Sequence, residues 1–288
     1  MRRLRAWDSL LGLNGRNAYI ARQNQPASIR LVNDKFATKG ALAGAGVPTV
    51  ESLLWVTSGR ELRRLEPDQL PAQWACKPNQ GLGGTGILLA AGRCQRGWHT
   101  FSGRQLSPRE VQDHVRLILD GEFSNRPKDT ALFEPLLVAH PGLARLSYRG
   151  LPDVRVICDG EDPRLAMLRL PTSASGGRAN LHQKAVGAAV DIGTGRVAAA
   201  MCNSRSITEH PDTREPLLGA EVPFWPEILS MASRCSGATG LLYVGADIVV
   251  DVDRGPLVLE VNARPGLQIQ NITGRGLREA LAVSEAAR

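Results

Sequence analysis

The chain is poor in aromatic residues and has no long block of like charge. Its 288 residues include only three tyrosines and five phenylalanines, and the basic residues are spread along the sequence. Proteins that bind single-stranded nucleic acid stack bases on aromatic side chains, and blocks of like charge are typical of nucleic-acid-binding tails. We therefore expect no nucleic-acid partner. The net charge of +7 still favours an anionic partner, and nucleotides or acidic metabolites fit best.

Paired cysteines and long apolar runs are also missing. The five cysteines include no Cys-x-x-Cys pair, and their odd number disfavours a disulfide framework or a zinc site. No apolar run approaches the roughly 20 residues of a membrane-spanning helix. The N-terminal segment MRRLRAWDSLLGL lacks the apolar core of a secretory signal. We expect a cytoplasmic protein without a transmembrane segment, built as one large domain or as two or three lobes.

Common nucleotide and nucleophile fingerprints are absent too. Neither the P-loop pattern GxxxxGK[ST] nor a strand–helix GxGxxG occurs, and there is no GxSxG or Cys–His signature. The chain instead has NQGLGGTG at residues 79–86, between predicted strands at 73–78 and 87–91. Bare backbone N–H groups in such a loop can approach phosphate oxygens, and the loop can move over a ligand. A plain connection between two strands is the alternative that this stretch alone leaves open.

Residues 245–266 carry the most informative pattern. Two apolar runs flank a turn at 253–255, which predicts a β-hairpin. Glu260 and Asn262 are two residues apart, so their side chains leave the same face of a strand. If the connection holds an even number of residues, Asp247 pairs with Glu260 and all three side chains share that face. Their oxygen atoms suit a hard cation such as Mg²⁺. An edge hairpin with its polar side chains turned to water is the alternative.

The rest of the chain alternates short strands and helices, without internal repeats. Residues 14–34 are polar and irregular, and we expect an arm there. Residues 173–197 are rich in glycine and predict a loop with a turn near 193–195. The other predicted elements are helices over 35–46, 59–70, 107–119 and 223–235, and strands over 47–56, 131–139, 152–158 and 164–171.

The N-terminal arm also has an apolar stripe at helical spacing. Trp7, Leu10, Leu11 and Leu13 form it, and such a stripe has to be buried against another surface. We expect this stripe to pack on the chain's own lobes. Arg16 and Arg22 would then lie near the acceptor side of the cleft, where they attract an acidic substrate.

As a set, the motifs resemble the ATP-grasp fold and, within it, the RimK-related α-L-glutamate ligases. Order and spacing match from about residue 33 to about residue 266. EVN-x-x-PG is the most specific motif and the glycine-rich loop the least. The motifs are DK at 34–35, a strand lysine at 77, the glycines of 81–86, FEPLLV at 133–138, DVRV at 153–156, NLH at 180–182, VGADIV at 244–249 and LEVNARPG at 259–266.

The resemblance implies an α+β protein in which two α+β lobes clamp ATP, with the glycine-rich loop as a lid. We expect the N-terminal arm over 1–33, an N-lobe with the lid over 34–140 and a C-lobe with the metal site over 141–288. ATP-grasp ligases usually carry a further domain before the DK helix. Only 34 residues precede Lys35 here, and they show no βαβ pattern. The sequence therefore predicts that a full N-terminal pre-ATP-grasp domain is lacking.

The resemblance also implies roles for individual residues. ATP would be bound by Lys35, Lys77, Gly81, Gly83, Gly84, Thr85, Gly86, Glu134, Pro135, Leu136 and Leu137. One or two Mg²⁺ ions, or Mn²⁺ in their place, would be bound by Asp247, Glu260 and Asn262. Catalytic roles go to Arg155, Arg169 and Arg264, and substrate-binding roles to Asn180, His182 and Lys184.

Each of these roles has a plainer alternative. Lys35 can be an ordinary lysine in the first turn of a helix, and His182 a surface histidine. Arg155 and Arg169 can be paired structural arginines. Arg264 departs from the family pattern, in which a small residue is usual, and its guanidinium would suit a substrate carboxylate.

These expectations predict an ATP-dependent carboxylate–amine ligase that forms an amide or peptide bond through an acyl phosphate, with glutamate or another amino acid as a candidate substrate. Such an enzyme needs no protein nucleophile, because positioning and charge neutralisation carry the reaction. A peptide or protein acceptor and an oligomeric state are both compatible with the sequence. An ATP-dependent phosphotransferase on the same fold and a non-catalytic nucleotide-binding subunit remain the alternatives.

Overall fold

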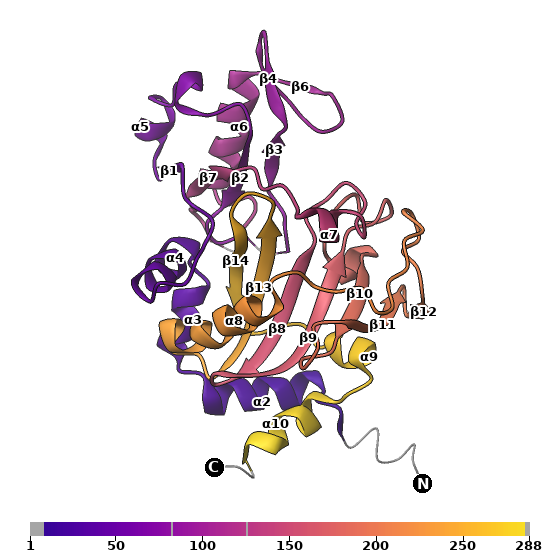
Figure 1. Ribbon diagram of the computed structural model, residues 1–288. Coiled ribbons are helices and arrows are strands. Elements are labelled where there is room, and N and C mark those ends of the chain that lie inside the picture. The colour runs from indigo at the N-terminus through magenta and orange to yellow at the C-terminus, as the bar shows by residue number, and fades with distance from the viewer. Residues whose placement is uncertain (1–8, 82, 125, 286–288) are drawn as a thin grey trace. The chain divides into compact units, whose positions relative to one another are not determined.

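The structure is a computed structural model that describes residues 9–81, 83–124 and 126–285 (Figure 1). The described chain divides into two compact units. The small unit holds residues 34–36 and 50–137, and the large unit holds the remainder. These bounds differ from the predicted lobes, because the segment 37–49 belongs with the large unit and not with the strands that follow it.

The small unit is built on two antiparallel sheets. The first has the order β1 (Leu54–Val56), β7 (Ala131–Pro135), β2 (Trp74–Pro78) and β3 (Leu88–Ala90). The second has the order β4 (Gly92–Cys94), β5 (Gly97–His99) and β6 (Gln105–Leu106). Helix α6 (Pro108–Leu119) contributes to the core, and the short helices α5 (Gly59–Leu62) and η1 (Pro67–Gln69) lie before β2. The largest buried side chains of this core are Trp74, Trp98 and Phe133.

Helix α6 begins where the sequence predicts. Ser107 is its N-cap, and its side chain accepts a hydrogen bond from the backbone N–H of Glu110, while the Glu110 carboxylate accepts one from the backbone N–H of Ser107. This reciprocal capping box satisfies donors that the first turn would otherwise leave unpaired. Val111, Val115 and Ile118 then recur at helical spacing and are buried in the core.

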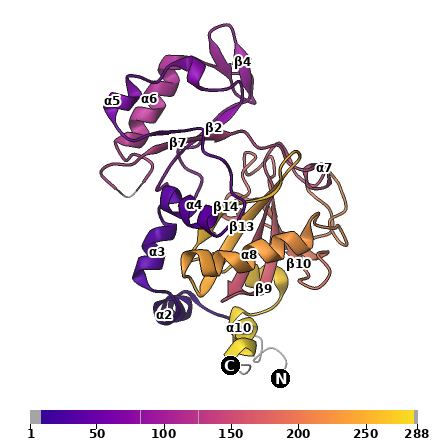
Figure 2. The same cartoon turned by 60° about the vertical axis from the view of Figure 1, so that its left-hand side comes forward.

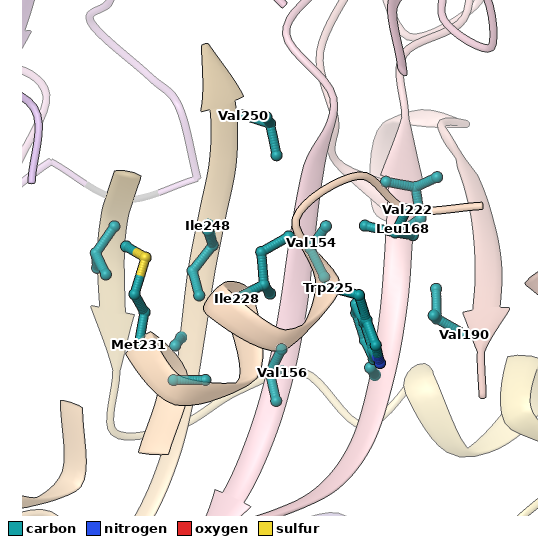
Figure 3. Close-up of a cluster of buried hydrophobic side chains, with 14 of the residues drawn as sticks. Val154, Val156, Leu168, Val190, Val222, Trp225, Ile228, Met231, Ile248 and Val250 are labelled. Carbon is teal, nitrogen blue, oxygen red and sulfur yellow. The ribbon is translucent and has the colours of Figure 1, made fainter. Parts of the chain in front are cut away.

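The large unit contains a seven-stranded antiparallel sheet with the order β12-β11-β10-β9-β8-β13-β14. Helix α8 (Trp225–Thr239) covers one face of it (Figure 2). Figure 3 shows the helix side chains Trp225, Ile228 and Met231 with strand side chains that include Val154, Leu168 and Ile248. The strands are β8 (Asp153–Asp159), β9 (Asp162–Leu170), β10 (Val186–Val190), β11 (Val197–Cys202), β12 (Arg205–Ile207), β13 (Tyr243–Asp251) and β14 (Gly255–Asn262).

The opposite face of this sheet is covered at one end by helices from both termini. They are α2 (Leu13–Gln23), α9 (Ile269–Thr273) and α10 (Leu277–Glu285). These helices share a buried core with Ile157, Met167 and Tyr243 of the strands. Because side chains on one face of a strand recur every second residue, Arg155 and Asp247 lie on this same face beyond the apolar core. The face is therefore apolar at one end and polar at the other.

The predicted irregular arm is wrong for residues 13–32. They form α2 and α3 (Pro26–Val32), and α4 (Lys35–Gly44) follows as predicted. Tyr19 and Ile20 are buried in the large unit, so tertiary packing stabilises a helix whose composition is polar. Leu11 is buried as well, which confirms that this segment packs on the chain itself. Leu13 is exposed, and Trp7 lies outside the described residues.

The predicted loop over residues 173–197 is also wrong in part, since it contains the fully buried strand β10. Its residues are small, and a side chain at Gly187 would meet Ile272 of α9 at 2.3 Å. The strand needs a glycine at this close approach, and its small residues give the sequence the composition of a loop. The remaining helix, α7 (Pro141–Ala144), lies before β8. The five cysteines are free thiols. Over the described residues, none of the helices combines the length and apolarity needed to cross a bilayer.

Asn24 ties α2 to the sheet, and its replacement should destabilise the large unit. Its side chain donates to the Tyr243 carbonyl at 2.8 Å and accepts from the N–H groups of Leu242 and Tyr243 at 2.9 Å each. Asn24→Ala would leave buried backbone groups without partners, and we expect the free energy of unfolding to fall by about 2–3 kcal/mol. Chemical denaturation measures this. Asn14→Ala, an exposed position on the same helix, is the control and should change stability by less than about 0.5 kcal/mol.

Candidate active site

In the small unit, Lys77 and Glu134 form a buried ion pair. Ala75 of β2 is opposite Glu134 of β7, so Lys77 is its diagonal neighbour on the same face. The Lys77 Nζ and Glu134 Oε2 atoms are 2.5 Å apart, and both side chains are almost fully buried. The resemblance assigns Lys77 to the phosphates and Glu134 to adenine. The structure brings these two residues into direct contact with each other.

The start of the glycine-rich loop is fixed by Lys35 and Asn79. The Lys35 ammonium donates to the carbonyls of Asn79 at 3.0 Å and Gly81 at 3.2 Å. The Phe36 N–H donates to the Asn79 side chain at 3.0 Å, and the Gln80 N–H donates to both carboxylate oxygens of Asp129. Sequence reasoning missed Asn79 and Asp129. Asn79 is a polar residue directly after a buried strand, and this position could have predicted its role.

The glycines of the loop are required by its backbone. Gly83, Gly84 and Gly86 have φ of +63°, +77° and +73°, a region that other residues enter at a cost. The Gly86 carbonyl is 2.9 Å from Nε2 of His114, and a side chain at Gly86 would meet the Phe123 ring at 2.5 Å. Burial lowers the pKa of His114, although its hydrogen bond to Gly86 acts in the opposite direction. The loop is thus held at both ends, with exposed residues between them.

The other residues predicted to bind ATP lie near these elements. Thr85 is exposed within the loop, and Pro135 is the last residue of β7. Leu136 and Leu137 follow it and are half-buried. The role of each in binding ATP stays a prediction.

In the large unit, the β13–β14 hairpin sets Asp247 opposite Glu260, as predicted. The sequence predicts this pairing for a connection with an even number of residues, but the connection observed is odd. Asp251 pairs with Gly255 across a three-residue turn, and a regular ladder from there would set Asp247 opposite Leu259. A register shift next to Ile248 inserts one extra residue, which places Glu260 opposite Asp247.

Two arginines from neighbouring strands converge on Asp247. Arg155 of β8 donates from Nε to Oδ1 and from Nη2 to Oδ2, both at 2.7 Å. Arg169 of β9 donates from Nη2 to Oδ2 of Asp247 at 2.8 Å and from Nε to Asp153 at 2.5 Å. Asn262 of β14 adds a bond to Oδ2 at 3.1 Å. The buried Asp247 carboxylate therefore accepts four hydrogen bonds from three strands, and these five residues form the arginine–carboxylate network.

The two acids of the arginine–carboxylate network have different pKa values. Burial raises the pKa of Asp153 to about 6, with the charge of Arg169 opposing this and that of Asp247 adding to it. Burial also acts to raise the pKa of Asp247, but the charges of Arg155 and Arg169 outweigh it and hold that pKa below its usual value. Asp153 is therefore the first of the two acids to take up a proton on acidification.

The remaining predicted site residues are not joined to the arginine–carboxylate network. Arg264 is exposed after β14. Asn180 begins the short helix η2 (Leu181–Gln183), and its side chain accepts from the His182 N–H at 3.0 Å. Lys184 ends this helix with a positive φ of 73°. Within the part of the chain that is described, no hydrogen bond or ion pair connects these four residues with Arg155 or Asp247.

The donor set fits a magnesium ion that is held mainly by its other ligands. Within residues 9–81, 83–124 and 126–285, no three His, Cys, Asp or Glu side chains are grouped to hold a metal. Glu260 is half-buried and shares its face with the amide of Asn262. One carboxylate and one amide oxygen suit Mg²⁺ that also binds phosphate oxygens. Asp247 is directed at the arginines instead, so its role as a metal ligand stays a prediction.

Comparison with known proteins identifies the family. The model of the sugar-transfer associated ATP-grasp family matches residues 14–285. The chain belongs to this ATP-grasp family. Among curated proteins, none matches the chain by sequence.

Several solved structures are similar to this chain in fold. The D-cycloserine synthetase DcsG is 16% identical with a TM-score of 0.53, over 90% of this chain and 72% of that one. The ATP-grasp ligase PsnB with a minimal precursor is 17% identical with a TM-score of 0.49, over 91% and 63%. A D-alanine–D-alanine ligase from Bacillus anthracis is 16% identical with a TM-score of 0.47, over 90% and 64%. The chain thus spans less than two thirds of the last two proteins.

The predicted α+β ATP-grasp fold is confirmed by the family match and by the antiparallel sheets of both units. The narrower resemblance to glutamate ligases stays a prediction.

Removing the Asp247 carboxylate should destabilise the large unit of this ATP-grasp protein severely. The Arg155 and Arg169 side chains are only 12% and 13% exposed, and Asp247→Ala would leave both guanidiniums without their shared partner. We expect the free energy of unfolding to fall by about 3–5 kcal/mol, measured by denaturant unfolding. Asp253→Ala, in the exposed turn of the same hairpin, serves as the control. Equal stability of the two variants would contradict a structural role for the arginine–carboxylate network.

Proposed function

We propose that this ATP-grasp protein is an ATP-dependent carboxylate–amine ligase. The observation that carries the proposal is the arginine–carboxylate network, which includes Asn262 and shares one sheet face with Glu260. Phosphoryl transfer needs positioned cations that offset charge on the transferred group. Arg155 and Arg169 are rigidly held, and Glu260 with Asn262 supplies oxygen ligands for a metal.

The proposed reaction has two steps. A carboxylate oxygen of the first substrate attacks the γ-phosphorus of ATP, and the bond to the β–γ bridging oxygen breaks to release ADP. The nitrogen of an amine then attacks the carbonyl carbon of the acyl phosphate. Inorganic phosphate leaves, and the nitrogen loses a proton to give the amide. Neither step requires a nucleophile from the protein.

The proposed roles follow the chemistry of each unit. In the small unit, Lys35, Lys77 and the glycine-rich loop would bind ATP. In the large unit, Glu260 and Asn262 would hold Mg²⁺ or Mn²⁺, which neutralises phosphate charge when bound. Arg155 would stabilise the transferred phosphoryl group. Asp247 would act chiefly by holding Arg155 and Arg169 in place, because its oxygens already accept their N–H groups.

The substrates are proposed only as classes. Glutamate or another amino acid is one candidate, from the resemblance of the motifs. The description of the family as sugar-transfer associated favours a substrate linked to sugar transfer. A peptide or protein acceptor fits the same chemistry, and the free cysteines favour the cytoplasm.

Glu260→Gln tests the metal site. The change preserves the shape of the side chain but removes the negative charge proposed to bind the metal ion, so ATP turnover should fall by about a hundredfold or more. ADP release with a panel of amino acids and peptides, together with product mass, measures this. Glu227→Gln, exposed on α8, is the matched control and should keep full turnover. Full activity of Glu260→Gln in a folded protein would overturn the ligase proposal. ADP release without any need for an amine would favour a phosphotransferase.

Gly86→Ala tests the glycine-rich loop. The variant meets both a positive φ and the Phe123 ring, so the loop should shift and ATP affinity should fall by about tenfold, or ~1.4 kcal/mol. Gly103→Ala is the control, because Gly103 also has a positive φ but no atom lies within 4 Å of its added carbon. Binding of a fluorescent ATP analogue gives the affinities. Limited proteolysis should also show the loop protected by Mg-ATP in the wild type. Equal affinity in the two variants would argue against a nucleotide role for the loop.

A further inference from the structure

The N-terminal helix α2 reaches the turn that follows the Glu260–Asn262 segment. Arg16 on this helix donates from Nη1 to the Pro265 carbonyl at 3.3 Å. Pro265 is three residues beyond Asn262 and packs over Gly245, where an added carbon would lie 2.7 Å from it. A residue far away in the sequence thus lies beside the most specific motif of the chain.

Across the residues that the structure describes, no carboxylate balances the charge of Arg16. Its Nη2 donates only to the neutral side chain of Asn17 at 3.3 Å, and its Nε is buried without a hydrogen-bond acceptor. Among the described residues, no carboxylate forms an ion pair with it, whereas Arg155 and Arg169 share Asp247. A half-buried guanidinium without a counter-charge is unfavourable, so a site for an anion is expected next to it.

A second donor without a partner lies close by. Tyr243 of β13 is fully buried, and its hydroxyl has no hydrogen-bond partner in the described chain. Its ring packs edge-on against Tyr19 of α2, with centroids 5.5 Å apart. Burial raises the pKa of Tyr243, while the nearby charges of Arg16 and Arg155 act to lower it. The hydroxyl therefore keeps its proton at neutral pH and lies within the field of both arginines.

Arg155 completes this group of donors. Its Nε and Nη2 bind Asp247, and its Nη1 lies near Gly266, where an added carbon would be 3.9 Å from it. Arg16 and Arg155 thus present N–H groups at the turn 263–266. Tyr243 lies on the same sheet face as Asp247, two residues before Gly245, over which Pro265 packs. A set of donors that includes one guanidinium without a counter-charge selects an anionic acceptor, and a planar carboxylate suits guanidinium groups best.

We propose that Arg16 and Tyr243 form a binding site for a carboxylate group of the substrate, so that the N-terminal helix takes part in substrate selection. This inference rests on the proposed ligase function and narrows its substrates to acids held at this turn. A neutral isostere would leave these buried donors without an acceptor. Leaving a buried donor unpaired costs free energy, so the site rejects neutral isosteres of the substrate.

The test uses the full chain and simple probes. Binding of small acids is measured by ligand-observed NMR for the wild type and for Arg16→Gln, Tyr243→Phe and Arg22→Gln. The probes are acetate, succinate, glutarate and L-glutamate, and the neutral amide of each acid is the control ligand. The sequence predicts Arg22 beside Arg16 at the acceptor side, but the structure groups Arg22 with Arg278 and Leu281 of α10. Arg22 lies on the same helix as Arg16 and is exposed, so its variant matches the change in charge outside the proposed site. We expect at least one acid and no amide to bind the wild type. Arg16→Gln should weaken this binding by about tenfold, the loss of one charge-assisted contact. Tyr243→Phe should weaken it by a smaller factor, and Arg22→Gln should leave it unchanged.

Stability separates binding from a structural role. Because the Arg16 charge is not balanced, Arg16→Gln should keep or raise the melting temperature, whereas a structural anchor would lower it. ATP-analogue affinity should stay unchanged, since a fall would assign the site to phosphate instead and overturn the proposal. Equal acid binding by Arg16→Gln and wild type, or no acid binding by the wild type, would also overturn it. The Glu260→Gln turnover assay is independent of these measurements, so failure of the ligase function is distinguishable from failure of this site.

Discussion

The buried carboxylate of Asp247 is the interaction on which the rest of the large unit's site depends. It accepts hydrogen bonds from Arg155, Arg169 and Asn262, which come from three other strands. Moving a charged group out of water costs several kcal/mol per ion. The attraction between opposite charges offsets this cost only when the geometry of the ion pair is good. Such a network adds little net stability. Its value is orientation: two guanidinium groups are fixed on one sheet face before any substrate arrives, which is the condition for electrostatic catalysis.

That orientation depends in turn on the apolar end of the same face. Ile157 and Arg155 are two residues apart on β8, so the strand that carries the arginine is also held in the core with α2, α9 and α10. These helices therefore support the polar end, and α2 also brings Arg16 to the turn beside it. Tyr243 belongs to the apolar core, and the charges of Arg16 and Arg155 act on its hydroxyl. Close packing at the apolar end of the face holds the strands in place, and this compensates for the unfavourable burial of charge at the polar end.

The sequence predicted those parts of the structure whose cause is local. The capping box of α6 and the hairpin of β13 and β14 depend on residues close together, and both were found. Helix α2 was missed because its polar composition gives no strong periodicity, and burial of Tyr19 and Ile20 stabilises it. The Lys77–Glu134 pair could not be predicted either, since it depends on the register of two distant strands. Asp247 and Glu260 are opposite each other because of a β-bulge, and no residue type in the sequence predicts that bulge.

The side chains of this face also limit the kind of chemistry it supports. The side chains of the arginine–carboxylate network are two arginines, two carboxylates and an amide, and within the described residues no serine, cysteine or histidine side chain bonds to it. Such a set can orient and neutralise anions, which is what the proposed ligase reaction requires of it. In that reaction, the substrate is activated by a phosphoryl group from ATP. A carboxylate that receives the phosphoryl group becomes an acyl phosphate, and the positive groups that bind the acid remain in place to stabilise it. The same arginines would thus serve selection and catalysis, which explains why the fold holds them so rigidly.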